Sequence, residues 1–243
     1  AAEHIQRTVR ELDLDISRCR HYEGENGAAR VTLEDGDRVF LGSNKGGVLR
    51  QHPLRLEQAD LDYIQTYHIV HTSNNSYLDG ELRNIKETGV LLSYDFSTRW
   101  NEPDRLRQVA SLADIAFLSC SDLTDAEAKR LLRQATGLGL SLAVATRGSR
   151  GALLYDGFAF LEQPSEYVEP VDTMGAGDGF ASALLVHLAA VWTDPEKGPE
   201  PEAIRQAAEA AAHFSAQVCL QSGAFGHGRP IPEDYHMTIV QNS

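Results

Sequence analysis

The chain has 243 residues, of which 42% are hydrophobic and 23% charged, so it can bury a sizeable core, and one large domain is the economical interpretation. Its net charge of -13 disfavours a surface for nucleic acid or for an anionic membrane, and no apolar run reaches the roughly 18 residues of a membrane-spanning helix. Cys19, Cys120 and Cys219 are widely spaced and predict neither a disulfide framework nor a zinc site. We therefore expect a cytoplasmic protein.

The first element expected is a helix over residues 2–12, because Ile5, Val9 and Leu12 recur at helical spacing. No strand precedes it. We therefore expect the chain to lack the beginning of its domain.

A β-hairpin is expected next, over residues 28–41. Its two β-prone runs flank a turn that contains Asp35 and Gly36, a common hairpin signal. Such a hairpin could form an exposed flap. Residues 44–47, with the sequence Asn-Lys-Gly-Gly, then predict a flexible exit where hinge motion would be cheap.

Helices and short apolar strands alternate from residue 56 onward. Helices are expected at residues 56–66, 78–88, 105–112 and 124–136, and strands at 69–72, 90–96, 115–120 and 142–146. This alternation predicts an α/β fold whose mostly parallel sheet is covered by helices on both faces. Ligands of such sheets bind beyond the carboxyl ends of the strands.

The alternation ends after Thr146. Residues 152–161 predict a tight hairpin, and with a further strand at 167–171 they predict an antiparallel edge beside the parallel sheet. Two helices, at 179–192 and 202–220, then close the domain, and residues 230–243 form a weakly patterned tail.

The most informative motif is the Gly175-Ala176-Gly177-Asp178 turn, which opens the first of these two helices. Unpaired N–H groups at a helix start, with the positive end of the helix dipole, suit a phosphate or a developing oxyanion. Asp178 would repel a bound phosphate unless it handles a proton. The alternative is a plain strand-to-helix turn with an acid in the first helical turn. The motif matches neither the Walker A loop nor the dinucleotide fingerprint.

Two further candidates follow predicted strands. The loop Thr146-Arg-Gly148-Ser-Arg-Gly151 has glycines that would let backbone approach a ligand, and a flexible connection is the alternative. Asp95 ends a strand at the ligand-facing rim, where an Asx turn is the alternative.

Other polar residues favour structural roles. Thr124 and Glu127 form a capping box, with a metal-related role for Glu127 as the minor alternative. His68 and His71 flank a strand without a third ligand at useful spacing, so they are expected to be packing or edge residues.

Residues 172–178 (Asp-Thr-Met-Gly-Ala-Gly-Asp) resemble the signature of the ribokinase-like (PfkB) carbohydrate kinases, and the 146–151 loop resembles their nucleotide loop. Residues 37–40 and 94–97, followed by Trp100, are together similar to the fructoselysine 6-kinase branch.

The resemblance implies a ribokinase-like three-layer fold, with residues 28–41 as a small β lid that excludes water and could pair with its twin in a homodimer. It implies ATP-dependent phosphorylation of a primary hydroxyl on a sugar or sugar-amine adduct, with fructoselysine converted to its 6-phosphate and Mg²⁺ arriving bound to ATP. A kinase for another sugar or a nucleoside, or a non-catalytic ligand-binding domain of the same fold, stays open.

The resemblance also implies roles for individual residues. Asp178 would be the catalytic base, and the N–H groups of Gly175, Ala176 and Gly177 would form the anion hole. The expected nucleotide-binding residues are Thr146, Gly148, Gly151 and Thr173, the substrate-binding residues are Asp95 and Arg38, and Asp172 stands where some relatives hold a monovalent cation.

Overall fold

The computed structural model describes residues 2–34, 37–192, 194, 197–224 and 226–228. These residues fall into two compact units, of which one contains residues 2–55 and 75–78 and the other contains 56–74 and 79–228. Among them, no helix combines the length and the apolar character that crossing a bilayer requires.

The first unit holds the predicted N-terminal helix and hairpin. Helix α1 spans Ala2–Glu11, and strands β1 (Ala29–Glu34) and β2 (Asp37–Ser43) pair antiparallel, with a register shift after Arg30. Both predictions are confirmed; the predicted turn residues 35 and 36 lie outside the described residues.

The expected flexible exit after the hairpin is instead a packed turn that leads into a short helix, α2 (Val48–Gln51). The side chain of Asn44 is buried; it accepts a hydrogen bond from the N–H of Ala28 (2.9 Å) and donates one to the carbonyl of Asn26 (2.7 Å). A Cβ on Gly47 would lie 2.1 Å from a neighbouring carbonyl oxygen. The glycine therefore serves close backbone packing, and the prediction of a flexible exit was wrong.

The second unit contains a six-stranded sheet with helices on both faces. Its strands are β3 (Ile69–Ser73), β4 (Leu91–Asp95), β5 (Ile115–Ser119), β6 (Leu142–Thr146), β7 (Ala152–Tyr155) and β8 (Phe160–Gln163). Its helices are α3 (Gln58–Ile64), α4 (Leu82–Glu87), α5 (Arg105–Ala110), α6 (Asp125–Thr136), α7 (Ala176–Val191) and α8 (Pro201–Cys219), with short 3-10 turns at Asp79–Glu81, Arg99–Asn101 and Gly148–Arg150.

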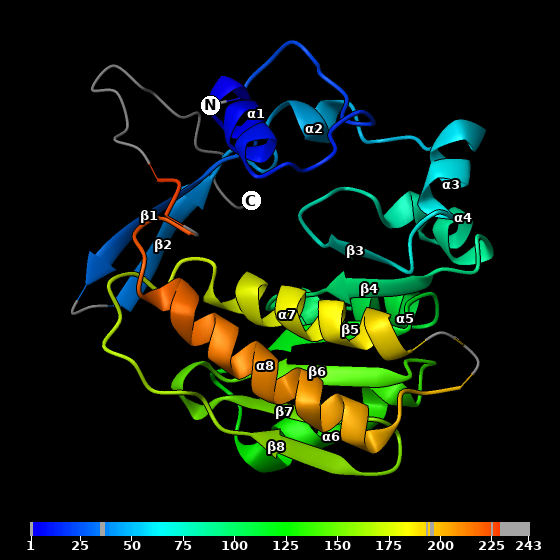
Figure 1. Ribbon diagram of the computed structural model, residues 1–243, viewed down its shortest axis with the longest axis vertical. Helices are drawn as coiled ribbons and strands as arrows, with labels where there is room; N and C mark the ends of the chain where they lie inside the picture. Colours follow the sequence, from blue (N-terminus) through cyan, green and yellow to red (C-terminus); the bar gives the residue numbers. More distant parts are fainter. Residues whose placement is uncertain (1, 35–36, 193, 195–196, 225, 229–243) are drawn as a thin grey trace. The chain divides into compact units, whose positions relative to one another are not determined.

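The strands lie in chain order across the sheet. Strands β3 to β6 are parallel, whereas β7 and β8 are added antiparallel at one edge. Helices α7 and α8 cover one face, and α5 and α6 lie behind the sheet (Figure 1). The inner strands are buried along almost their whole length, which explains why they read as continuous apolar runs in the sequence. The predicted α/β fold with a mostly parallel sheet is confirmed.

One predicted strand is absent. Residues 167–171 have no regular secondary structure, and the N–H groups of Val171 and Asp172 both donate to the carbonyl of Cys219 at the end of α8 (2.9 and 3.2 Å). Pro164 precedes this segment and Pro170 lies within it, and a proline cannot donate to a strand ladder. The antiparallel edge of the sheet therefore ends at β8.

Helix α7 begins at Ala176, three residues earlier than predicted, because Gly175 adopts the left-handed conformation (φ 80°) that starts it. One turn along, Gly179 packs against α8, where a Cβ would lie 2.9 Å from a methyl group of Val218. This close contact fixes the start of α7 against the end of α8.

Candidate active site

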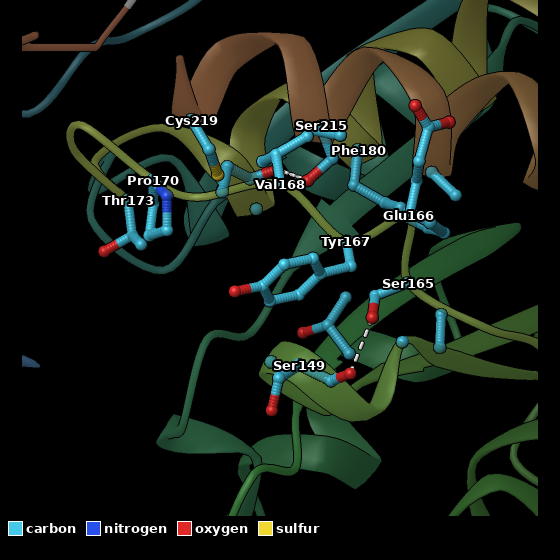
Figure 2. Close-up of a pocket in the computed structure, with 18 of the residues that line it drawn as sticks. Ser149, Ser165, Glu166, Tyr167, Val168, Pro170, Thr173, Phe180, Ser215 and Cys219 are labelled. Atoms are coloured by element: carbon cyan, nitrogen blue, oxygen red, sulfur yellow. Dashed lines mark hydrogen bonds between the residues drawn. The ribbon is translucent and has the colours of Figure 1, made fainter. Parts of the chain in front are cut away.

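A cavity of about 460 Å³ opens in the second unit between the end of β6, the start of α7 and the side of α8 (Figure 2). Six of the residues predicted to bind nucleotide or phosphate line it: Thr146, Gly148, Gly151, Thr173, Ala176 and Gly177. The two glycine-containing motifs of the sequence therefore lie at one cavity, beyond the carboxyl end of a central strand.

The start of α7 presents unpaired backbone donors. Within the described part of the chain, the N–H groups of Gly175, Gly177 and Asp178 have no hydrogen-bond partner, whereas that of Ala176 donates to the carbonyl of Thr173 at 3.3 Å. Gly177 is exposed, and a Cβ placed on it would meet nothing within 4 Å. Open N–H groups at the positive end of a 16-residue helix suit an anion.

Asp178 lies exposed in the first turn of α7, and its negative charge acts on two residues of the neighbouring strands β4 and β3, Asp95 and His71. Burial raises the pKa of Asp95, a hydrogen bond from the N–H of Ser97 opposes this shift, and the charge of Asp178 adds to it. Restricted hydration lowers the pKa of His71, although that residue keeps an exposed surface, and Asp178 opposes the shift. The structure thus groups Asp178, Asp95 and His71.

Asp95 also forms the Asx turn that was the structural alternative to a ligand-binding role. Its Oδ1 accepts the N–H of Ser97 at 2.7 Å and forms an Asx turn at the end of β4. His71 lies on the edge strand β3, where its Nδ1 is 3.0 Å from the hydroxyl of Ser93 and its ring packs edge-on against Phe117. The expectation of an edge or packing histidine is confirmed, and its proximity to Asp178 was not foreseen.

The glycines of the 146–151 loop serve the protein's own backbone as well as the cavity. Gly151 has a φ of 77°, and a Cβ on it would lie 2.1 Å from the carbonyl oxygen of Gln163 and 2.6 Å from the nitrogen of Ser165. Gly148 has a φ of 59°, and its nearest neighbour would be the Ser121 hydroxyl at 3.6 Å. Gly151 is therefore required because another segment of the chain crosses it closely, whereas at Gly148 only the left-handed backbone conformation favours glycine.

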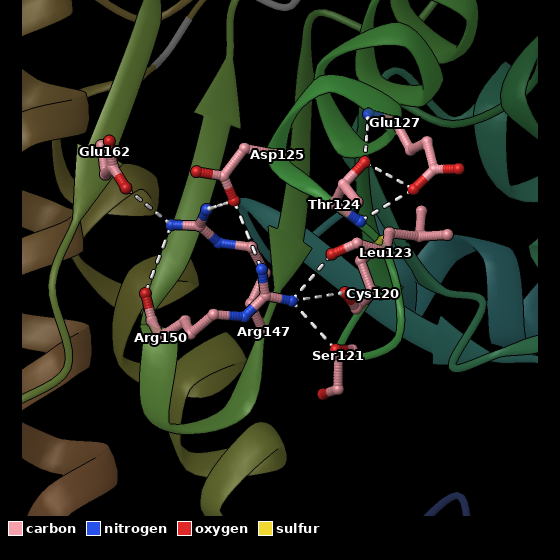
Figure 3. A network of polar contacts seen from close by, with 9 residues as sticks. All are labelled: Cys120, Ser121, Leu123, Thr124, Asp125, Glu127, Arg147, Arg150 and Glu162. Atoms are coloured by element: carbon pink, nitrogen blue, oxygen red, sulfur yellow. Dashed lines mark hydrogen bonds and ion pairs between the residues drawn. The ribbon is translucent and has the colours of Figure 1, made fainter.

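Arg147 fixes this loop from inside the protein (Figure 3). Its side chain is buried, and its guanidinium donates to Asp125 at the start of α6 (2.8 Å) and to Glu162 on β8 (3.1 Å). Both carboxylates are more than half exposed. The buried cation is thus paired with two partners that water also solvates.

Arg150 binds the loop to the segment after β5. Its guanidinium donates to the carbonyl oxygens of Ser121 (2.9 Å) and Leu123 (2.8 Å), and it also pairs with Asp125 (3.3 Å) (Figure 3). Both arginines of the loop therefore point into the scaffold, and its small residues are left to face the cavity.

The carboxylate of Asp172 joins two loops. Its Oδ1 accepts the N–H of Met174 and its Oδ2 accepts the N–H of Gly223, each at 2.9 Å. This bonding positions the turn before α7.

Thr124 and Glu127 form the predicted capping box. The Thr124 hydroxyl accepts the N–H of Glu127 (3.3 Å), and the Glu127 carboxylate accepts the N–H of Thr124 (2.9 Å). The part of the chain that the structure describes contains no group of three or more His, Cys, Asp or Glu side chains arranged to hold a metal.

Arg38 belongs to the first unit, where it stands in β2 opposite Leu33. Its predicted contact with a substrate stays a prediction.

Sequence reasoning missed several residues of the cavity, above all those of the 164–170 segment and of α8. Ser149, Ser165, Glu166, Tyr167 and Ser215 all line it. A usable signal was the pair of prolines around residues 165–169, which argues for an irregular segment in place of a strand.

Comparison with known proteins assigns the chain to a family. The family description "pfkB family carbohydrate kinase" matches residues 1–228. The chain is 37% identical over 231 residues to "Fructosamine kinase FrlD" of Bacillus subtilis, covering 95% of this chain and 77% of that protein. It is 31% identical to "Fructoselysine 6-kinase" of Shigella flexneri, covering 79% of this chain and 72% of that protein.

Solved structures agree in fold. Ribokinase from Giardia lamblia superimposes with a TM-score of 0.75 at 16% identity, covering 91% of this chain and 73% of the other. A fructokinase double mutant from Vibrio cholerae, solved with fructose, ADP and potassium, gives a TM-score of 0.68 at 20% identity, covering 91% of this chain and 76% of the other. The ribokinase-like fold is thereby confirmed. The chain belongs to the pfkB family of carbohydrate kinases and is an ATP-dependent sugar kinase.

Proposed function

We propose that this kinase transfers the γ-phosphoryl group of ATP to the primary hydroxyl of a sugar-amine adduct, and that fructoselysine is its acceptor. The similarity to a fructosamine kinase and to fructoselysine 6-kinases supports the acceptor class. The observation that carries the proposed chemistry is the exposed carboxylate of Asp178 directly after the open N–H group of Gly177, at the start of α7.

In the proposed reaction, Asp178 accepts the proton of the acceptor hydroxyl as that oxygen attacks the γ-phosphorus. The bond from the γ-phosphorus to the β,γ-bridging oxygen breaks, and ADP leaves with the bonding electrons. The N–H groups at the start of α7 stabilise the negative charge on the transferring group. A positioned base of this kind contributes about 10²–10⁴-fold to the rate.

The cavity suits the nucleotide. Its volume of about 460 Å³ lies within the usual range for small-molecule sites, and Thr146, Gly148 and Thr173 offer small polar groups to the phosphates. Gly151 acts by holding the loop in place. Magnesium, bound to the ATP phosphates, would offset their negative charge.

The acceptor is proposed to bind on the other side of Asp178, where Asp95 and His71 share its electrostatic environment. Carboxylate and imidazole groups can hydrogen-bond the hydroxyls of a sugar. We propose that Arg38 binds the acceptor. The 28–41 hairpin is proposed to be a lid within a single ribokinase-like domain, and also the part through which two copies of the chain form a homodimer. We further propose that a monovalent cation binds near Asp172.

The acceptor is tested by incubating the protein with MgATP and, separately, with fructoselysine, fructose, ribose and adenosine. We expect kcat/KM for fructoselysine to exceed that for each other acceptor at least tenfold (~1.4 kcal/mol), with a monophosphate as product. Higher kcat/KM with fructose or ribose would move the assignment to another sugar kinase. Absence of ADP formation with every acceptor would contradict the proposed chemistry itself.

A further inference from the structure

The lining of the cavity combines two kinds of surface. Small polar groups include Thr146, Gly148 and Gly177, which belong to the motifs already assigned to the phosphates. Apolar side chains include Phe180 of α7 with Ala212 and Ala216 of α8, all of them buried. Such a lining fits a ligand that has both an anionic part and a flat, weakly polar part.

The irregular segment 164–170, which we call the strap, is held at both walls of this cavity. The Ser165 hydroxyl donates to the carbonyl of Ser149 in the 146–151 loop (2.6 Å). The next residue, Glu166, pairs with the Nδ1 of His213 on α8 (2.9 Å). The strap therefore bridges the loop and the helix that form the two sides of the cavity, although it belongs to no strand or helix.

The strap begins and ends at fixed points as well. At its start it crosses Gly151 so closely that no side chain would fit there. Just beyond its end, the N–H of Val171 donates to the carbonyl of Cys219 at 2.9 Å. A segment anchored at four points can hold one side chain in a constant position.

Tyr167 is that side chain. It lines the cavity and is nevertheless 88% exposed, and Figure 2 shows its ring among the residues that line the cavity. An aromatic ring of this size is usually packed, since it can bury a large apolar area. Its neighbours Ser165 and Glu166 use their side chains to anchor the strap, whereas the Tyr167 ring is left exposed at the cavity.

We propose that Tyr167 stacks on the base of the nucleotide bound in this cavity, with the strap holding the ring in position. The inference rests on the proposed function, because it requires the phosphates of the same nucleotide to bind at the two glycine-containing motifs. Stacking depends little on which base is bound, since every base has a π-face. Tyr167 therefore strengthens nucleotide binding in general, and selection among bases falls to other groups.

The test is a set of binding titrations on the full chain with ATP, GTP and inorganic tripolyphosphate, each with Mg²⁺. In Tyr167→Ala we expect ATP and GTP to bind about tenfold more weakly, from the usual strength of base–aromatic stacking. Tripolyphosphate, which has no base, is expected to bind as it does to the unaltered protein. Tyr167→Phe keeps the ring and should stay within about twofold for all three probes.

Phe158 provides the matched control, because it is 95% exposed in the β7–β8 turn and does not line the cavity. Phe158→Ala should leave all three affinities unchanged. Equal ATP affinity in Tyr167→Ala and the unaltered protein would overturn the inference, as would an equal loss of tripolyphosphate binding or a failure of the unaltered protein to bind nucleotide. If the base-dependent loss is seen but no acceptor is phosphorylated, the proposed function fails and the stacking role stands.

Discussion

Gly151 and Gly177 belong to two turns that line the same cavity, and their surroundings are opposite. In the 146–151 loop, the space beside Gly151 is filled by the backbone of residues 163–165. At the start of α7, the space beside Gly177 is empty, and its N–H group has no partner among the described residues. A glycine in a motif thus indicates that something approaches the backbone closely, without saying whether this is the protein or a ligand.

The charged residues of the two turns follow the same division. Arg147 and Arg150 are directed into the scaffold, where carboxylates and carbonyl oxygens hold them. Asp178 is exposed beside the open N–H groups. We infer that the first turn shapes the cavity and that the second carries the chemistry; substitutions in the two turns should separate these roles.

The largest effect is expected for Asp178→Asn. Loss of the proposed base should lower kcat by about 10²–10⁴-fold. Because Asp178 is exposed, the free energy of unfolding should change by less than about 0.5 kcal/mol. Steady-state kinetics and urea unfolding measure the two quantities, and a variant that keeps its kcat would remove Asp178 from the reaction.

Gly151→Ala should act in the opposite sense, through stability. A Cβ cannot fit 2.1 Å from the Gln163 carbonyl, so we expect a loss of about 2–3 kcal/mol in the free energy of unfolding. Gly157 is the matched control, because its φ of 91° is also positive but nothing lies within 4 Å of an added Cβ. Gly157→Ala should cost about 1 kcal/mol, from backbone strain alone. Equal losses in the two variants would show that the chain crossing at Gly151 contributes nothing.

Gly177→Ala should lower activity and spare the fold. The added methyl group meets no protein atom, and alanine favours a helix over glycine by up to about 1 kcal/mol, so the protein should unfold no more easily than before. At the proposed phosphate site the methyl group would crowd the transferring group, and we expect kcat/KM for ATP to fall about tenfold (~1.4 kcal/mol). Unchanged kcat/KM would mean that the open space beside Gly177 is not used by the nucleotide.

The smallest effect concerns the pH dependence of stability at Asp95. Burial raises the pKa of its carboxyl above 3.8 in the folded state. The folded protein therefore holds this proton more tightly than the unfolded chain does, and the stability from it is present at low pH and lost as pH rises through the folded pKa.

Asp95→Asn should remove that dependence, because asparagine can still accept the N–H of Ser97 and has no charge to bury. We expect the variant to gain stability relative to the unaltered protein as pH rises from about 4 to 7, by under about 1 kcal/mol. Urea unfolding across this range measures the difference. A gain that does not vary with pH would contradict the assigned cause.

The sequence predicted most of the second unit, because its inner strands are buried on both faces and therefore stand out as apolar runs between helical stretches. It failed at residues 167–171, which were predicted to form a strand although Pro164 precedes them and Pro170 lies among them. It also misread the Asn44 turn, since the buried hydrogen bonds of that side chain join residues far apart in the chain.

The sequence pointed to the part of the candidate site whose residues all lie in one motif, residues 172–178. The cavity wall from α8 and the contact between Glu166 and His213 depend on segments 47 residues apart, which local pattern does not reveal. The same reason hid the crossing at Gly151, because its partner lies on the far side of the β7–β8 hairpin.

The central claim is that Asp178 acts on the proton of the acceptor and does not hold the phosphate site together. The most direct measurement is the affinity of Asp178→Asn for MgATP, determined by titration beside its kcat. Removing a negative charge next to a phosphate should leave ATP binding equal or tighter while turnover is lost. Loss of ATP binding together with activity would contradict the claim, because it would make Asp178 a part of the nucleotide site.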